Sequence, residues 1–122
     1  MSYWTHILTL LSFSVLIDKR VYKEEVDCFT QEALNVRDLI DPDMLFSKKM
    51  AFDWFMAHRE EKLAQLNSDK FELHILEPIM ALSAMKERAH VLAAMDEIIQ
   101  SDGEVHEQEV KLIDLARANW GL

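Results

Sequence analysis

The sequence predicts an all-α domain: a compact bundle of about six helices, in which two pseudo-symmetric helix-turn-helix hairpins are bridged by a long central helix. Three observations support this fold class. Gly and Pro occur only twice each in 122 residues, too few for the many turns of an all-β chain. Half of the residues are hydrophobic, so one domain can bury a sizeable core without disulfide bonds or a structural metal. Apolar residues recur every three to four positions, which is the period of an amphipathic helix.

The first predicted helix ends near Ile17 and is strongly apolar. One face carries Trp4, Ile7, Leu8, Leu11 and Val15, and this face is widened by Leu10, Phe13 and Ile17. The apolar run from Ile7 to Ile17 is shorter than the about 20 residues that span a bilayer. Residues 1–6 contain no Lys or Arg, which a signal peptide would carry there. We therefore expect this helix to lie in the core, and we expect no membrane partner.

The second helix is predicted from about Lys23 to Asn35, because its apolar positions repeat the same spacing. Asp41-Pro42 then has the pattern of a helix cap followed by proline at the first helical position, where the missing N–H costs nothing. A long third helix is expected from this point to about Leu66. Its middle, residues 50–57, is apolar almost all round, so it lies either in the core or in a contact with a second copy or another protein.

The later helices are predicted from breaks in the pattern. Residues 67–69, Asn-Ser-Asp, form a break with a cap signal, and Pro78 is expected to kink or restart the fourth helix. Ser83 is expected to cap a fifth helix that runs through Ile99, and the last helix is expected from about Glu107 to Asn119. The whole chain, 1–122, is thus predicted to be one domain, with a first hairpin at about 3–36, bridging helices at about 42–82 and a second hairpin at about 83–120.

Charge and motif content narrow the class of function. Thirteen basic residues stand against twenty-two acidic ones, and the net charge of −9 argues against nucleic acid as a partner, since phosphate binding needs clustered Lys and Arg. Cys28 is the single cysteine, so we expect a buried, inert thiol in a cytoplasmic protein. The histidines show no zinc-ligand spacing, and the chain contains neither a G-x-S-x-G motif nor a phosphate-binding glycine loop. We therefore expect a protein that is not an enzyme.

One motif, D-x-x-V-x-x-x-E-V, occurs twice, at residues 18–26 and 102–110. At an offset of 84 residues the matching positions are Asp18 with Asp102, Val21 with Val105, Glu25 with Glu109 and Val26 with Val110. In both copies an apolar helix is predicted before the motif and an amphipathic helix after it. The repeat therefore predicts a duplicated hairpin, with the two copies packed in pseudo-symmetry.

Helix capping explains most of this motif. If His106 and Tyr22 are the N-cap residues, Glu109 and Glu25 take the third helical position, where a capping-box carboxylate accepts the N-cap backbone N–H. The valines on either side then form a hydrophobic staple. Gly103 suits the left-handed conformation that often follows a helix.

Capping does not explain Asp18 and Asp102, which follow a helix where the dipole makes an acid unfavourable. Two interpretations are open. In one, the aspartates and the two glutamates converge about a pseudo-twofold axis and bind a hard cation such as Ca²⁺ or Mg²⁺. In the other, they are solvated acids on an acidic protein. Residues 102–109 match the second half of an EF-hand loop, but the ligands of the first half are missing, so an ordinary EF-hand site is not expected.

Residues 94–109, AMDEIIQSDGEVHEQE, resemble the TerB-like family of tellurite-resistance proteins. That family is all-helical and carries an Asp-Gly turn followed by a helix-starting glutamate, with a weaker copy near its N-terminus. The resemblance implies a module linked to tellurite resistance or stress response, with a divalent metal held by Asp18, Glu25, Asp102 and Glu109. The first copy departs from the family at residues 19–20, Lys-Arg, so the second copy is the stronger candidate. The alternative is a scaffolding domain without a metal site, which associates through its third helix.

Overall fold

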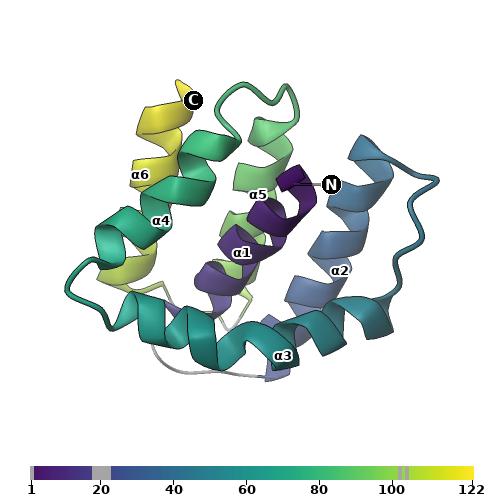
Figure 1. Cartoon of the computed structure of the whole chain (residues 1–122), viewed down its shortest axis with the longest axis horizontal. Helices are drawn as coiled ribbons and strands as arrows, with labels where there is room; N and C mark the ends of the chain where they lie inside the picture. The colour runs from purple at the N-terminus through teal and green to yellow at the C-terminus, as the bar shows by residue number, and fades with distance from the viewer. Residues whose placement is uncertain (1, 18–22, 102, 104) are drawn as a thin grey trace.

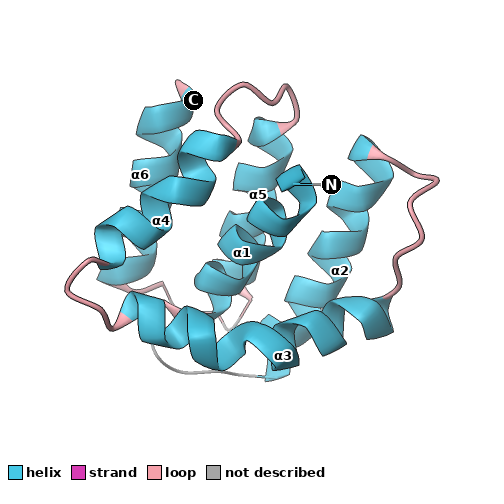
Figure 2. Ribbon diagram, in the orientation of Figure 1, coloured by secondary structure: helices cyan, strands magenta, loops and turns pink. Residues whose placement is uncertain are grey.

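Six helices make up most of the described part of the chain (Figures 1 and 2). The structure is a computed structural model that describes residues 2–17, 23–101, 103 and 105–122. The helices are α1 (Ser2–Leu16), α2 (Lys23–Ile40), α3 (Lys48–Leu66), α4 (Phe71–Ala81), α5 (Arg88–Gln100) and α6 (Glu107–Trp120). No residue within these ranges lies in a β-strand, which confirms the all-α prediction.

The centre of the fold is formed by α1 and α5, which pack against each other and run in the same direction (Figure 1). Every described residue from Ile7 to Ile17 is buried, including three with hydroxyl groups. The Ser14 hydroxyl donates to the carbonyl of Leu10 at 3.0 Å, which satisfies it inside the core. The N-terminal apolar run is therefore a core helix, as predicted. Among the described helices, none is both long and apolar enough to cross a membrane.

The remaining helices surround this pair unequally. α2 packs against α1, α3 and α5, whereas α6 packs against α5 and α4. α4 itself packs against α1 and α6, and α3 crosses the end of the bundle that is lowest in Figure 1. The two hairpins therefore have different neighbours, and α4 lies on the side of α1 that faces α6.

The boundary between α2 and α3 differs from the prediction. α2 continues to Ile40 rather than ending near Asn35. Asp41 then closes that helix, because its backbone N–H donates to the carbonyl of Arg37 at 2.8 Å. The Arg37 guanidinium also donates to the carbonyl of Met44 at 2.8 Å, which holds the connection against the end of α2.

Pro42 therefore does not occupy the first position of a helix, and that prediction was wrong. Ser47 is the N-cap of α3 instead, with extended backbone angles and a hydroxyl that accepts the Met50 N–H at 3.2 Å. A serine in that geometry satisfies one of the unpaired N–H groups of the first turn. α3 therefore begins at Lys48, six residues after the predicted start at Pro42.

The start of α5 was also predicted wrongly. The Ser83 hydroxyl donates to the carbonyl of Met80 at 2.8 Å, so it completes the end of α4 and does not cap the next helix. α5 begins at Arg88, after a turn. Pro78 lies inside α4, which ends at Ala81, so the proline precedes the end of one helix and does not start another.

The apolar middle of α3 has two different faces. Ala51 and Phe55 are buried, and the Phe55 ring lies 5.3 Å from that of Phe29 on α2. Phe52 and Met56, one helical turn apart, are 45% and 42% exposed. The expectation of a central position therefore holds for the inner face only.

Candidate functional site

The two copies of the repeated motif occupy equivalent places in the two hairpins. α1 and α5 end at Leu16 and Gln100, and α2 and α6 begin at Lys23 and Glu107. Both pairs of positions are 84 residues apart, the same offset as the sequence repeat. The helices on either side of each turn thus begin and end in register, as a duplicated hairpin requires. In Figure 1 the C-terminal ends of α1 and α5 and the N-terminal ends of α2 and α6 lie at the end of the bundle that α3 crosses.

Glu109 is the third residue of α6 and is fully buried. Its Oε1 accepts the backbone N–H of His106 at 2.8 Å, and His106 has the extended backbone of an N-cap residue. This is the carboxylate half of a capping box, as the sequence predicted. Gly103 precedes it with φ of +81°, the left-handed conformation expected after α5. The staple valines, Val105 and Val110, remain 54% and 44% exposed.

Glu25 is the third residue of α2 and is also fully buried. In the first turn of a helix the positive end of the helix dipole favours a carboxylate. One turn further along, burial and, to a smaller extent, the negative charges of Glu32, Glu97 and Glu25 together raise the pKa of the Cys28 thiol to about 11. Cys28 is half-buried rather than buried, but at that pKa little thiolate forms near neutral pH. The same charges show that acidic side chains surround the interface of α2 and α5.

The structure places only half of the predicted metal-binding set. Glu25 and Glu109 are described and buried, whereas Asp18 and Asp102 lie outside the described residues, as do Lys19 and Tyr22. Within the described ranges, no three His, Cys, Asp or Glu side chains form a group that could hold a metal ion. The role of the two aspartates therefore stays a prediction.

A small hollow of about 160 Å³ lies beside Glu109, between α5 and α6. Asp96 and Asp114 add carboxylates to its lining, and Arg117 adds a positive charge. Asp96 accepts a hydrogen bond from Gln100 at 2.9 Å, and Asp114 lies 3.6 Å from Arg117. These acids are bound to neighbours on their own helices, which is the ordinary arrangement of helix-surface charges.

No protein-family model, curated protein or solved structure matches this chain. The resemblance to TerB-like proteins therefore rests on the sequence itself, on residues 94–109 and the weaker first copy of the motif. Roles for individual side chains have to be argued from the geometry of the chain itself.

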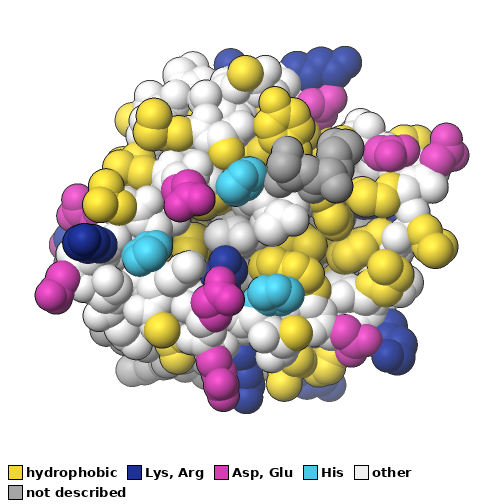
Figure 3. All heavy atoms as spheres, viewed as in Figure 1, with side chains coloured by type: hydrophobic (Ala, Val, Ile, Leu, Met, Phe, Trp, Pro, Cys, Tyr) yellow, Lys and Arg dark blue, Asp and Glu magenta, His cyan; other side chains and the backbone are white. Residues whose placement is uncertain are grey.

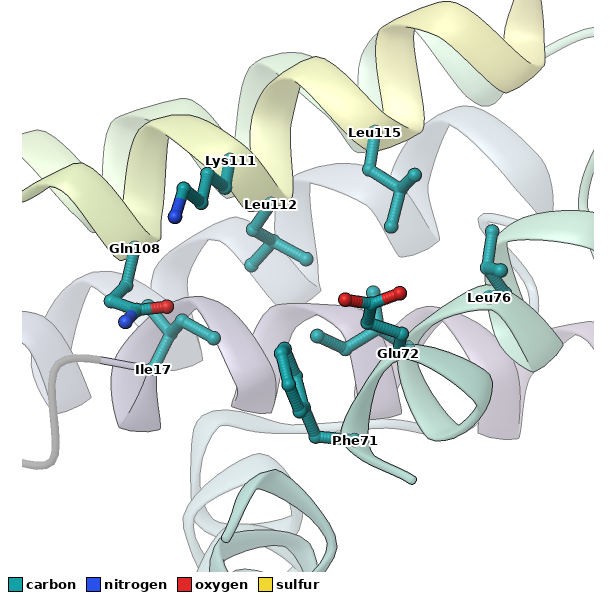
Figure 4. A pocket seen from close by; sticks show the side chains of 9 residues that line it. Ile17, Phe71, Glu72, Leu76, Gln108, Lys111, Leu112 and Leu115 are labelled. Carbon is teal, nitrogen blue, oxygen red and sulfur yellow. The ribbon is translucent and has the colours of Figure 1, made fainter. Parts of the chain in front are cut away.

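A pocket that sequence analysis missed lies between α4 and α6 and has a volume of about 340 Å³ (Figure 4). It is lined by Ile17, Phe71, Glu72, Ile75, Leu76, Gln108, Lys111, Leu112 and Leu115. The lining of α4 and that of α6 are more than thirty residues apart in the chain, so no local spacing marks them as neighbours. Only the packing of α4 beside α6 brings them together.

Proposed function

We propose that the chain is a non-enzymatic helical module of the TerB-like kind, which binds a divalent cation through its two acidic turns. The observation that carries this proposal is the matched pair of buried glutamates, Glu25 and Glu109, at the third position of α2 and α6. Both carboxylates hold equivalent places directly after the two copies of the acidic motif, which argues for a shared role of the two copies.

The glutamates and the aspartates would have different roles in cation binding. The hydrogen bond from His106 holds the Glu109 carboxylate at the start of α6, so this glutamate shapes the turn and adds negative potential. The aspartates of the turns, Asp18 and Asp102, would supply the ligand oxygens. Ca²⁺ and Mg²⁺ both prefer such oxygen ligands. Asp102 is expected to matter more than Asp18, because Lys19 and Arg20 follow Asp18 directly and oppose a cation.

Calorimetric titration of the chain with Ca²⁺, Mg²⁺, Mn²⁺ and Zn²⁺ tests the proposal. We expect one of the first three ions to bind, and we expect Asp102→Asn to weaken that binding at least about tenfold, the loss of one ligand charge. Asp18→Asn should weaken it less. Asp114→Asn is the matched control, since it removes the same charge from an exposed position on α6. The proposal is wrong if no ion gives heat, or if Asp102→Asn and Asp114→Asn bind equally well.

A second function, association with a partner protein or a second copy, is favoured by the outer face of α3. Phe52 and Met56 lie one turn apart on it and are nearly half exposed. Figure 3 shows further hydrophobic side chains over α3 and the connection that precedes it, where Leu45 is 89% exposed. Exposed apolar side chains that gather in this way are typical of contact surfaces.

Sedimentation velocity of the chain over a wide concentration range tests self-association. We expect a concentration-dependent dimer that Phe52→Asp abolishes, whereas Asp53→Asn, the neighbouring exposed position, leaves it unchanged. A chain that stays monomeric at about 1 mM, a concentration at which even a weak contact of about −4 kcal/mol half-forms, excludes a second copy.

A further inference from the structure

The pocket between α4 and α6 combines an apolar floor with a polar rim. Ile17, Ile75 and Leu112 are buried and form the floor, while Phe71, Leu76 and Leu115 are half-buried and form the walls. Glu72, Gln108 and Lys111 are exposed and stand at the rim. Ligand pockets in proteins have this composition, and 340 Å³ lies near the lower end of their range of roughly 300–1,000 Å³. The volume and lining of the pocket fit a small molecule with an apolar part.

The rim carries one negative and one positive charge, which lie on opposite sides of the pocket. In Figure 4 the Glu72 carboxylate extends from α4 into the space, while the Lys111 and Gln108 side chains enter it from α6. Glu72 lies in the first turn of α4, at the end of the helix where acidic side chains are favoured. It has no hydrogen-bond or ion-pair partner among the residues that the structure describes.

Lys111 is held only weakly in its present place. Its ammonium lies 3.5 Å from Glu107, one turn earlier on α6, and both side chains are mostly exposed. Such surface pairs contribute little, so a ligand group could replace Glu107 at small cost. Lys111 and Glu72, both within the described part of the chain, form no salt bridge with each other across the pocket.

We propose that this pocket binds a small apolar amino acid or a similar zwitterion. The ammonium group of the ligand would lie on Glu72, its carboxylate on Lys111 and Gln108, and its apolar side chain on the floor. A simple carboxylic acid would place its negative charge near the negative charge of Glu72, in a chain whose net charge is −9. A simple amine would place its positive charge near the positive charge of Lys111. A ligand that carries both charges can pair with both Glu72 and Lys111 and is repelled by neither.

Two-dimensional ¹⁵N–¹H NMR on the full chain, titrated with L-phenylalanine and L-leucine, tests this site. We expect shifts confined to residues of α4, α6 and the end of α1. Phenethylamine and 3-phenylpropionate each keep the apolar body but only one charge. Each should bind at least about fivefold more weakly than L-phenylalanine, the effect of one partly exposed charged hydrogen bond.

Substitutions assign the two ends of the ligand. The Glu72→Gln variant should bind L-phenylalanine no more tightly than it binds 3-phenylpropionate. The Lys111→Gln variant should bind L-phenylalanine no more tightly than it binds phenethylamine. Glu77→Gln is the control for the first, because Glu77 is exposed on α4 and lines a different hollow. Lys49→Gln is the control for the second, because Lys49 forms the same kind of pair, 2.8 Å from Asp53 one turn away. Both controls should bind as the original chain does.

Leu115→Trp locates the site, because the indole of a half-buried wall residue would fill the pocket. Leu115→Trp should abolish the NMR shifts, while thermal unfolding shows that the variant still folds. If this variant does not fold, Leu76→Phe is used to fill the pocket instead. The proposal is wrong if the shifts survive the filled pocket, or if phenethylamine binds as tightly as L-phenylalanine. The proposal is equally wrong if no shift occurs at about 10 mM ligand. A ligand of about a dozen non-hydrogen atoms in a real pocket would bind with a dissociation constant below that concentration. Asp102→Asn should leave this site unchanged, so its outcome is independent of cation binding.

Discussion

Substitution of Glu109 measures how much the buried carboxylate contributes to the second acidic turn. Glu109→Ala removes the acceptor of the His106 N–H at 2.8 Å, and lost helix caps typically cost about 1–2 kcal/mol of unfolding free energy. It also removes buried methylene groups, each contributing about 0.8 kcal/mol. The side chain is fully buried, so the two effects add to about 2–4 kcal/mol. Glu109→Gln keeps the carbonyl oxygen and should cost about 1 kcal/mol or less, mainly through the lost charge near the helix dipole.

Urea unfolding followed by circular dichroism gives these free energies, and thermal unfolding checks them. For a chain of this size 1 kcal/mol corresponds to roughly 3–5 °C in Tm, so Glu109→Ala should lower Tm by about 6–20 °C. Glu107→Ala is the matched control on the same helix. Glu107 is 84% exposed and only 3.5 Å from Lys111, so its loss should cost at most about 0.5 kcal/mol.

Two results would refute this reasoning. If Glu109→Ala costs no more than Glu107→Ala, the hydrogen bond to His106 does not stabilise α6. If Glu109→Gln costs as much as Glu109→Ala, the charge of the carboxylate matters and the capping hydrogen bond does not. In that case Glu109 would be held by a positive group of the turn, and its place in a cation site would have to be reconsidered.

Other predictions concern single groups. Because its pKa is raised to about 11, Cys28 should react with iodoacetamide at pH 8 about a hundredfold more slowly in the folded chain than in urea, where the ordinary value is 9.0. The folded state binds this proton more tightly, so the thiol's contribution to stability is complete below pH 9 and is lost as pH rises through 11, which urea titrations would show. Trp120→Phe removes the indole N–H that donates to the Ile79 carbonyl at 2.7 Å and should cost about 1–2 kcal/mol in the same assay, whereas no loss would show that water replaces the bond. Gly103→Ala should cost about 1 kcal/mol through φ of +81° alone, since no other atom lies within 4 Å of the added Cβ; a cost near zero would mean that the turn changes conformation.

The helices themselves were predictable because their signals are local. The apolar run that precedes Asp18 already marks a core helix. Lys23 and Glu107 were identified as helix starts from the spacing of the apolar positions that follow them, and the capping pattern of the repeated motif agrees with both starts. Such signals act between residues three or four apart, so they survive without knowledge of the fold.

Local cap signals did not fix every helix start. Asp41-Pro42 resembles the start of a helix, but Ser47 caps α3, and Ser83 resembles a cap but completes α4 instead. The choice depends on where the helix must lie to bury its apolar face. For α3, burial of Phe55 against Phe29 on α2 determines which face points inward, and that contact joins residues far apart in the chain.

The candidate sites divide in the same way. The acidic turns, with Glu25 and Glu109 at matching places, were determined by the sequence alone, because a repeat and a capping pattern need no tertiary information. The pocket between α4 and α6 was decided only by the tertiary structure. Its charged residues, Glu72 and Lys111, belong to separate helices. They line one pocket only because burial of the apolar faces of α4 and α6 places the two helices side by side.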